Sequence, residues 1–342
     1  MDIDERKRKV LTAIVNIYTQ QGEPVGSNLL SQYLDLRVSP ATLRNEMAAL
    51  TRLGFLVQPH TSAGRVPSLE GYRYYMEHLM HSERISPADK QRVDELFATL
   101  NYDTEKLAQG AAAGLSEMTG YTSIITTPSR PDTAVAHYEI IQVGRYSAAI
   151  LAVSQTGVVA TRVANAKRDL TAEDMKLLSY AMNTFLTFIT PGDITQERAR
   201  ELVLALGGRA GELMPVISGA IRLLGDMGVS HLYVEGQERL LDYSELDTSL
   251  RGIISLFGDE RGLESLITQG SAEVQCVYGA EIPGYYLPGL CLLSAKYSAG
   301  GGMTGALALA GPARMDYLKL IPLLKYFTGK LGQTFSTGGK EE

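Results

Sequence analysis

One short predicted helix, centred near residue 46, carries side chains that can read nucleic-acid bases. Arg44 and Asn45 can each make paired hydrogen bonds to a base, arginine to guanine and asparagine to adenine. Thr42 adds a hydroxyl group, and Ala41 and Ala48 are small enough to let the helix approach base edges closely. This composition predicts a recognition helix that enters the major groove of DNA.

The surrounding residues fix the ends and the buried face of this helix. Ser39 can accept a hydrogen bond from a free N–H of the first turn, and Pro40 fits the first helical position, where a missing N–H has no cost. Gly54 suits the left-handed position that ends such a helix. The apolar positions are spaced i, i+4 and i+7 and predict a core-facing stripe: Leu43, Met47 and Leu50.

A small hairpin, or wing, follows the recognition helix. The sequence predicts a strand at 55–58, a polar tip at 59–64 and a return strand at 65–66. Donor side chains on a wing can bond phosphates or reach into a minor groove, while Ser39 and Thr42 hold the helix on the backbone or contact bases. The predicted DNA-binding residues are Ser39, Thr42, Arg44, Asn45, His60, Thr61, Ser62 and Arg65.

Winged-helix modules of this kind also bind protein partners, so an adaptor that never meets DNA is the alternative interpretation. The exposed face favours DNA because it carries donors, where a packing helix would carry apolar or acidic residues. Two more helices, predicted at 4–21 and 27–34, complete the three-helix unit, and Ser27 is expected to cap the second. The charged run at 5–9 is either a phosphate contact or a solvated helix end.

Net charge is distributed unevenly along the chain. The 342 residues carry a formal charge of −6, which by itself argues against nucleic acid, but residues 1–84 hold ten basic and nine acidic side chains. That segment is therefore only weakly basic. We expect affinity to depend on dimerisation and base contacts more than on a general attraction to phosphates.

Motifs for other functions are missing from the sequence. Cys276 and Cys291 lie in apolar, strand-like runs that predict buried, inert thiols rather than a disulfide framework. His78 and His81 share a helical turn without completing a metal-binding set. No phosphate loop, dinucleotide fingerprint or hydrolase motif is present, so no catalytic residue, cofactor or metal is expected, and the chain is not predicted to be an enzyme.

The N-terminus and the hydropathy pattern bear on localisation. The first ten residues lack the apolar core of a signal peptide, and no run of about 18 apolar residues is apparent. A cytoplasmic protein without a membrane segment is therefore expected.

Beyond the wing, the pattern of apolar residues predicts a mixture of helices and strands. A helix from Ser68 carries an aromatic stripe that is either core or a hinge for docking the first domain: Tyr72, Tyr75, Met76 and Leu79. Strand-like runs occur at 137–144, 147–154, 158–165, 231–234, 273–278, 290–298 and 305–311, and the first three suggest an antiparallel meander. Helices are expected at 86–100, from after residue 103 to about 118, and at 171–190, 196–206, 212–224, 246–257 and 263–269. A last helix is expected after residue 317.

Two runs carry a specific resemblance. SPATLRNEMAALTRLGFL (39–56) and HTSAGRVPSLEGYRYYM (60–76) closely resemble the DNA-binding part of the heat-inducible transcription repressor family HrcA, and the chain length and later segments are compatible with that family. The resemblance implies a repressor of heat-shock chaperone operons that binds an inverted-repeat operator and is kept active by the chaperonin. It also implies a GAF-like domain with an inserted dimerisation domain.

The expected architecture is α+β and multidomain. A winged helix-turn-helix at 1–84 precedes a GAF-like antiparallel sheet domain at 85–168 and 244–342, interrupted by a mostly helical dimerisation domain at 169–243. Three strands, a helical block and three more strands predict one six-stranded sheet, and apolar residues of the inserted helices are either a partner surface or core. The predicted partners are double-stranded DNA, the chaperonin and a second copy. The chief alternative within transcription is a regulator gated by a small molecule in the GAF-like domain.

Overall fold

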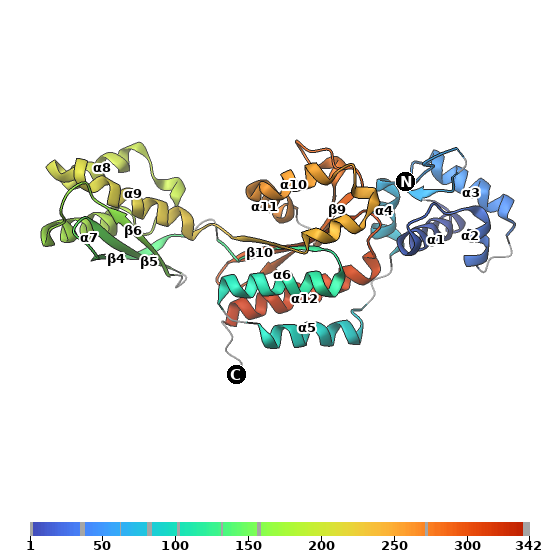
Figure 1. Ribbon diagram of the computed structural model, residues 1–342, viewed down its shortest axis with the longest axis horizontal. Coiled ribbons are helices and arrows are strands. Elements are labelled where there is room, and N and C mark those ends of the chain that lie inside the picture. Colours follow the sequence, from blue (N-terminus) through green and yellow to red (C-terminus); the bar gives the residue numbers. More distant parts are fainter. Residues whose placement is uncertain are drawn as a thin grey trace. The chain divides into compact units, whose positions relative to one another are not determined.

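The computed structural model divides the chain into two compact units (Figure 1). It describes residues 3–34, 38–61, 63–80, 84–100, 103–130, 133–155, 159–270 and 273–337. The main unit comprises Met1–Thr126, Leu232–Tyr297 and Ala306–Glu342. The inserted unit comprises Thr127–His231 and Ser298–Gly305.

The main unit begins with a three-helix winged helix, as predicted. Its elements are α1 (Glu5–Gln21), α2 (Ser27–Tyr33), α3 (Pro40–Arg52), β1 (Leu56–Val57), β2 (Val66–Pro67), α4 (Leu69–Tyr74) and a π-helical turn (Tyr75–Leu79). The expected cap of α2 is corrected: Gly26 holds the N-cap position without a side-chain bond, and Ser27 is the first helical residue and is buried. Leu43, Met47 and Leu50 face the core as expected.

Two residues of the aromatic stripe after the wing belong to the core of the main unit, whereas Met76 and Leu79 are half-buried. Tyr72 and Tyr75 are both 2% exposed, and the ring of Tyr72 meets that of Tyr317 edge to face at 5.8 Å. Arg73 lies over the ring of Tyr278 and pairs with Glu281. The residues of α4 therefore pack the winged helix against the rest of the main unit, which agrees with both the core and the docking interpretation of this stripe.

A five-stranded sheet forms the centre of the main unit. Its strands lie in the order β7-β3-β10-β9-β8, and the pairs β3–β7, β3–β10 and β8–β9 are antiparallel. The strands are β3 (Thr122–Thr126), β7 (Leu232–Glu235), β8 (Val274–Tyr278), β9 (Leu290–Ser298) and β10 (Thr304–Pro312). The helices are α5 (Pro87–Thr99), α6 (Thr104–Thr119), α10 (Leu250–Gly258), α11 (Glu260–Thr268) and α12 (Tyr317–Thr337), with 3₁₀ turns at Gln237–Asp242, Ser244–Leu246 and Gly279–Glu281.

Helices cover this sheet on both faces. Ala306, Ala308 and Ala310 of β10 share a buried cluster with Ile253 of α10 and Leu263 of α11. On the other side, α6 and α12 run next to each other beneath the sheet, with α5 outside them (Figure 1). This burial on both sides explains why β9 and β10 are almost continuously apolar.

The inserted unit is a three-stranded meander with helices on one face. Its order is β4-β5-β6, antiparallel throughout, as the sequence predicts. The elements are β4 (Val135–Gln142), β5 (Ser147–Ser154), β6 (Val159–Asn165), α7 (Ala172–Phe185), α8 (Gln196–Leu206) and α9 (Ala210–Met227), with 3₁₀ turns at Pro191–Asp193 and Gly207–Arg209. Tyr138, Ile140 and Ile150 from the inner face pack against Leu178 and Val216 from the helices.

The predicted six-stranded sheet is wrong. The strands at 137–165 make their own sheet in the inserted unit, and the second sheet uses β3, a strand that the sequence analysis does not predict. The compact inserted unit accordingly begins at Thr127 and takes in the meander, whereas the sequence places the start of the insertion at residue 169. Similar apolar runs can join either sheet, because pairing between distant segments is decided by packing and not by local pattern.

One stretch, Gln196–Met227, is by length and composition apolar enough to cross a membrane. It holds α8 and α9, which are separated by the 3₁₀ turn at Gly207–Arg209, and α9 packs its buried residues against the sheet as a core helix does. Glu212, Arg222 and Asp226 interrupt α9, so the stretch is not an unbroken apolar run.

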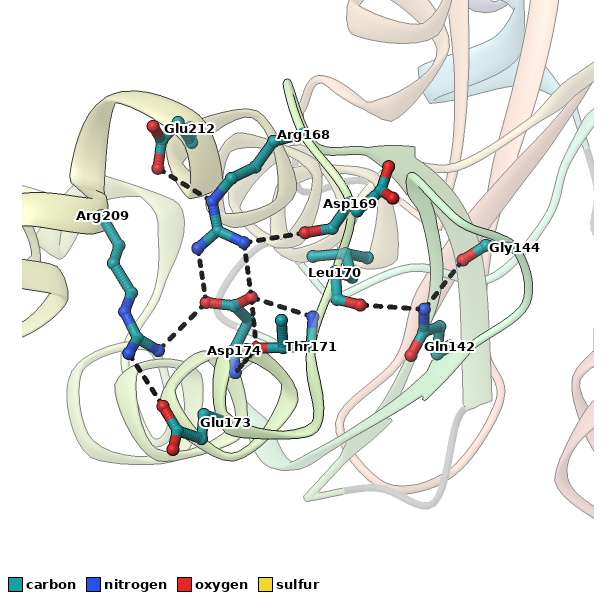
Figure 2. Close-up of polar contacts among 10 residues, drawn as sticks. All are labelled: Gln142, Gly144, Arg168, Asp169, Leu170, Thr171, Glu173, Asp174, Arg209 and Glu212. Carbon is teal, nitrogen blue, oxygen red and sulfur yellow. Dashed lines mark hydrogen bonds and ion pairs between the residues drawn. The ribbon is translucent and has the colours of Figure 1, made fainter.

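A fully buried carboxylate begins α7 (Figure 2). Asp174 and Thr171 form a capping box, and Arg168 approaches Asp174 with two nitrogens, each 2.8 Å from a carboxylate oxygen. Arg209 adds a third contact at 3.2 Å, and Glu212 accepts from Arg168 Nε at 3.0 Å. The bonds from Arg168, and after them those from Thr171, hold the pKa of Asp174 well below its usual range. The cluster joins the start of α7 to the start of α9.

Candidate nucleic-acid interface

The first turn of α3 is held by two hydroxyl groups. Ser39 is the N-cap, and its Oγ accepts the N–H of Thr42 at 3.2 Å, with Pro40 at the first helical position as predicted. The Ser39 and Thr42 hydroxyl oxygens also lie 3.0 Å apart. Ser39 is exposed and Thr42 is half-buried. Gly54, at a φ of +85°, takes the left-handed conformation expected just beyond the helix.

The exposed face of α3 presents the two predicted base-reading side chains. Arg44 and Asn45 are both exposed, while Leu43 and Met47 beside them are buried. The same helix therefore anchors in the core through one stripe and offers a guanidinium and an amide to solvent through another. This geometry suits a helix that lies in a groove.

The one acidic residue of α3 is turned toward α1. Glu46 Oε2 lies 3.3 Å from Lys7 Nζ and Glu46 Oε1 lies 3.7 Å from an Arg6 nitrogen. Lys7 also bonds Asp4, and these carboxylates, Asp4 first, raise the pKa of Lys7. Part of the basic run at 5–9 thus holds α1 against α3, and the negative charge of Glu46 is balanced there by ion pairs with Lys7 and Arg6.

A glutamine side chain closes the tip of the wing. Gln58 Nε2 donates to the carbonyl oxygens of Thr61 at 2.9 Å and Ala63 at 3.0 Å, and the Ala63 N–H donates to the His60 carbonyl at 2.9 Å. His60 and Thr61 are exposed at this tip, as predicted. Ser62, also a predicted contact, lies outside the described residues.

Arg65 lies at the base of the wing and not at its tip. Its backbone pairs with Val25 through two hydrogen bonds of 2.9 Å, and its Nε donates to Thr51 Oγ1 at 3.1 Å. Gly64 is required here, because a Cβ at that position would meet the Val25 carbonyl oxygen at 2.3 Å. The half-buried Arg65 thus joins the wing to the C-terminal end of α3, in addition to any contact with DNA.

Two residues of this surface escape prediction from the sequence. Gln58 acts through the turn that it closes, and only the polar run after it hints at this role. Asn28 of α2 is exposed and shares a cleft with Arg44 and Arg65, which lie 16 and 37 positions away in sequence. The sequence spacing does not predict either residue as part of this surface, because loops connect the elements that bring them near α3.

Two histidines that are close in sequence, His78 and His81, and the two cysteines lie apart from this surface along the chain. Within the described ranges, no group of three His, Cys, Asp or Glu side chains is placed to hold a metal ion. Cys276 and Cys291 are free thiols on β8 and β9, with their sulfurs 2.6 Å apart. Cys291 is buried, which raises the pKa of its thiol, whereas Cys276 is only half-buried.

These features define a winged helix-turn-helix protein: three packed helices, an exposed polar face on the third helix, and a hairpin wing beside that helix. Comparison with known families agrees and is more specific. Residues 2–79 match the winged helix-turn-helix transcription repressor, HrcA DNA-binding model, and residues 105–321 match the HrcA protein C-terminal domain. The chain belongs to the HrcA family of heat-inducible transcription repressors, which is not a class of enzymes.

Relatives resemble the chain over nearly its full length. The heat-inducible transcription repressor HrcA of Desulforudis audaxviator is 34% identical, covering 97% of this chain and 98% of the relative. The HrcA of Geobacter sulfurreducens is 32% identical over 96% of this chain and 97% of its own length. A crystal structure described as that of a hypothetical protein at 2.2 Å resolution shares the fold, with a TM-score of 0.58, 23% identity, and coverage of 98% and 99%.

Proposed function

We propose that this chain represses heat-shock chaperone operons by binding an inverted-repeat operator as a homodimer. One observation carries the proposal: α3 is anchored by Leu43 and Met47 and presents Arg44 and Asn45 to solvent. Two copies related by a twofold axis would place two such helices in successive major grooves, so the symmetry of the protein would match that of the operator. Arg44 and Asn45 carry base readout in this proposal, and the other predicted contacts hold the backbone.

The inserted unit supplies a surface for the second copy, but not on its helices. From sequence, the apolar residues of these helices are interpreted as either a partner surface or core. The structure buries them against the meander, as at Leu178, Met182 and Leu186. The opposite face of the meander instead carries exposed and half-buried apolar side chains, which it shares with His137, Glu139 and Thr161. Aligned side chains on that face, which we call the outer sheet face, are Ile141, Ala149, Leu151, Val153, Val159 and Val163.

The outer sheet face favours dimerisation on energetic grounds. Ile141, Val159 and Val163 are 54%, 56% and 63% exposed, and a contiguous apolar surface of this kind is stabilised by burial against a partner. Val163→Asp should convert a dimer to a monomer in sedimentation-velocity experiments, whereas Leu204→Asp, which adds the same charge at an exposed apolar position of α8, should leave the dimer intact. A dimer that survives Val163→Asp would exclude this face.

In the proposed mechanism, a chaperonin binds the repressor and keeps it active. The repressor acts in the cytoplasm. Support for both comes from family membership. The decisive experiment measures binding of the full chain to a labelled operator fragment from a chaperone promoter, with and without chaperonin, while salt and temperature are varied. Tight binding that resists random competitor DNA is expected, and it should strengthen with chaperonin. Binding no tighter than to heparin or random DNA would favour the adaptor alternative.

A ligand-gated regulator is the second candidate, and the cavity that favours it lies outside the sheet that the sequence analysis assigns to the GAF-like domain. A cavity of about 350 Å³ in the main unit is lined by α1, the start of α5 and the start of α12, with Asn16, Tyr75, Arg84 and Lys319 among its polar side chains. Its volume is at the low end of the range for small-molecule sites. Mass spectrometry of the native protein would detect a ligand that copurifies. A ligand whose removal changes operator affinity would support this candidate.

A further inference from the structure

A polar cleft lies between α2, α3 and the wing. Its volume is about 400 Å³, and its polar lining comes from Ser27 and Asn28 of α2, Arg44 of α3, and Gln58, Thr61 and Arg65 of the wing. We call it the wing cleft. It adjoins the exposed face of α3 because Arg44 belongs to both.

The charges around the wing cleft favour an anion. Among the described residues that line it, the charged side chains are Arg44 and Arg65, and none is acidic. Glu46, the nearest carboxylate along α3, is paired with Lys7 on α1. An anion in the cleft would therefore bind next to Arg65, with Arg44, which also belongs to the base-reading face, adding positive charge nearby and no carboxylate opposing it.

The guanidinium of Arg65 is held in place before any ligand arrives. Its Nε donates to Thr51 Oγ1 at 3.1 Å and its Nη1 approaches the Gly64 carbonyl at 3.4 Å. Arginine has five N–H donors, so these contacts leave donors for a ligand. A side chain that is already ordered loses less conformational entropy on binding. Gln58, through its bonds to Thr61 and Ala63, likewise fixes the rim formed by the wing tip.

We propose that the wing cleft binds one phosphodiester of the operator backbone and that Asn28 is an additional DNA contact. This inference rests on the proposed function, since it places the DNA strand that borders the groove occupied by α3. A helix in the major groove is flanked by phosphates, and the preceding helix crosses the backbone. The amide of exposed Asn28 can donate to a phosphate oxygen, a contact that positions the protein without reading sequence.

The test combines protein variants with single neutral linkages in DNA. The operator is selected by the wild-type chain from random-sequence DNA, and a methylphosphonate replaces each phosphate in turn. Asn28→Ala should weaken binding to operator and to random DNA by the same factor, about 3- to 10-fold. At one phosphate in each half-site, the methylphosphonate and Asn28→Ala should not add, because each removes the same contact.

Two further variants keep the result interpretable. Asn28→Asp preserves size but places a carboxylate near the phosphate, so it should weaken binding more than Asn28→Ala. Gln91→Ala removes an exposed amide from α5, where Gln91 bonds Glu95, and should bind DNA as the wild type does. Circular dichroism and thermal melting establish that the variants are folded.

The outcomes separate the cleft from the function. Loss of additivity at one phosphate per half-site supports the cleft, whereas additivity at every phosphate overturns it while the repressor function stands. A change of sequence preference in Asn28→Ala also overturns it. Saturable binding of inorganic phosphate to DNA-free protein, lost in Asn28→Ala and combined with additivity throughout, would assign the cleft to a free anion instead. A wild-type chain that selects no DNA sequence overturns both the function and the cleft.

Discussion

Arg65 donates from Nε to the hydroxyl oxygen of Thr51 over 3.1 Å, which ties the return strand of the wing to the last turn of the recognition helix. Thr51 itself bonds the Met47 carbonyl one turn earlier. The wing and α3 are therefore positioned together, and a change at this contact should affect DNA binding without altering either predicted base-reading side chain.

Replacing Thr51 tests this connection. Thr51→Val removes the acceptor for Arg65 and should weaken binding to all DNA sequences by about 1 kcal/mol, the usual value of one hydrogen bond. Amide hydrogen exchange at 56–66 should become faster because the wing is less firmly held. Thr51→Ser retains the hydroxyl and should behave as the wild type. Equal affinities for the valine and serine variants would show that the contact does not position the wing.

Arg44→Ala should alter sequence preference. The exposed guanidinium on α3 is placed to meet a base edge, and its loss should cost about 1–3 kcal/mol on the operator and much less on random DNA. Competition binding with a library of operator variants would locate the position at which discrimination is lost. An unchanged ratio of operator to random affinity would assign Arg44 to the backbone alone.

Unlike Arg44→Ala, Arg65→Ala should lower DNA affinity without altering sequence preference. Because Arg65 lines the wing cleft and supports the wing, its loss should weaken binding to operator and random DNA alike. The slope of log affinity against log salt should fall by about 0.9 if one phosphate contact is lost. Measurements at several salt concentrations decide this, and an undiminished slope would limit Arg65 to its intramolecular role.

The recognition helix could be predicted from sequence because its determinants are local. The cap at Ser39, the glycine at Gly54 and the spacing of Leu43 and Met47 all lie within one helix length, and each was found where expected. The contact between Arg65 and Thr51 could not be predicted, since it depends on how the hairpin folds back over 14 residues. The same is true of the wing cleft, whose lining comes from three elements.

The assignment of strands to sheets required the structure. In β4, His137 and Glu139 alternate with buried Tyr138 and Ile140, a pattern typical of a sheet with one open face. In β10, alanine and leucine alternate and both faces are buried. This difference in apolar pattern is present in the sequence, and it distinguishes strands of the inserted unit from strands of the main unit once the structure is known. The buried β3 carries no comparable signal, because five residues are too few to establish a period.

The two cysteines should differ in reactivity. Cys276 is half-buried, whereas Cys291 is buried and its pKa is raised, so little thiolate is available there. Iodoacetamide should modify Cys276 first, and Cys291 only after denaturation, as measured by mass spectrometry of peptides. Equal modification of the two in the native protein would contradict the burial of Cys291.

Asp174 should control the acid stability of the inserted unit. Its folded pKa is lowered, chiefly by Arg168, so its carboxylate stabilises the folded state fully above the unfolded pKa of about 4. This contribution is lost as the pH falls from about 4 toward the folded pKa. Asp174→Asn removes the charge and should destabilise the unit by about 3 kcal/mol at neutral pH, because Arg168 and Arg209 lose their buried partner.

Asp169→Asn is the matched control for that substitution, because Asp169 pairs with Arg145 at 2.9 Å on the surface, where the side chains of Arg145 and Asp169 are 78% and 48% exposed. An exposed pair of this kind contributes at most about 1 kcal/mol, so this variant should unfold nearly as the wild type does. Urea denaturation at pH 7 and pH 3 measures both variants. The wild type should lose more stability than Asp174→Asn between these pH values, since the variant has already lost the titrating carboxylate. Equal losses in the two proteins would place the acid sensitivity of the inserted unit at other carboxylates.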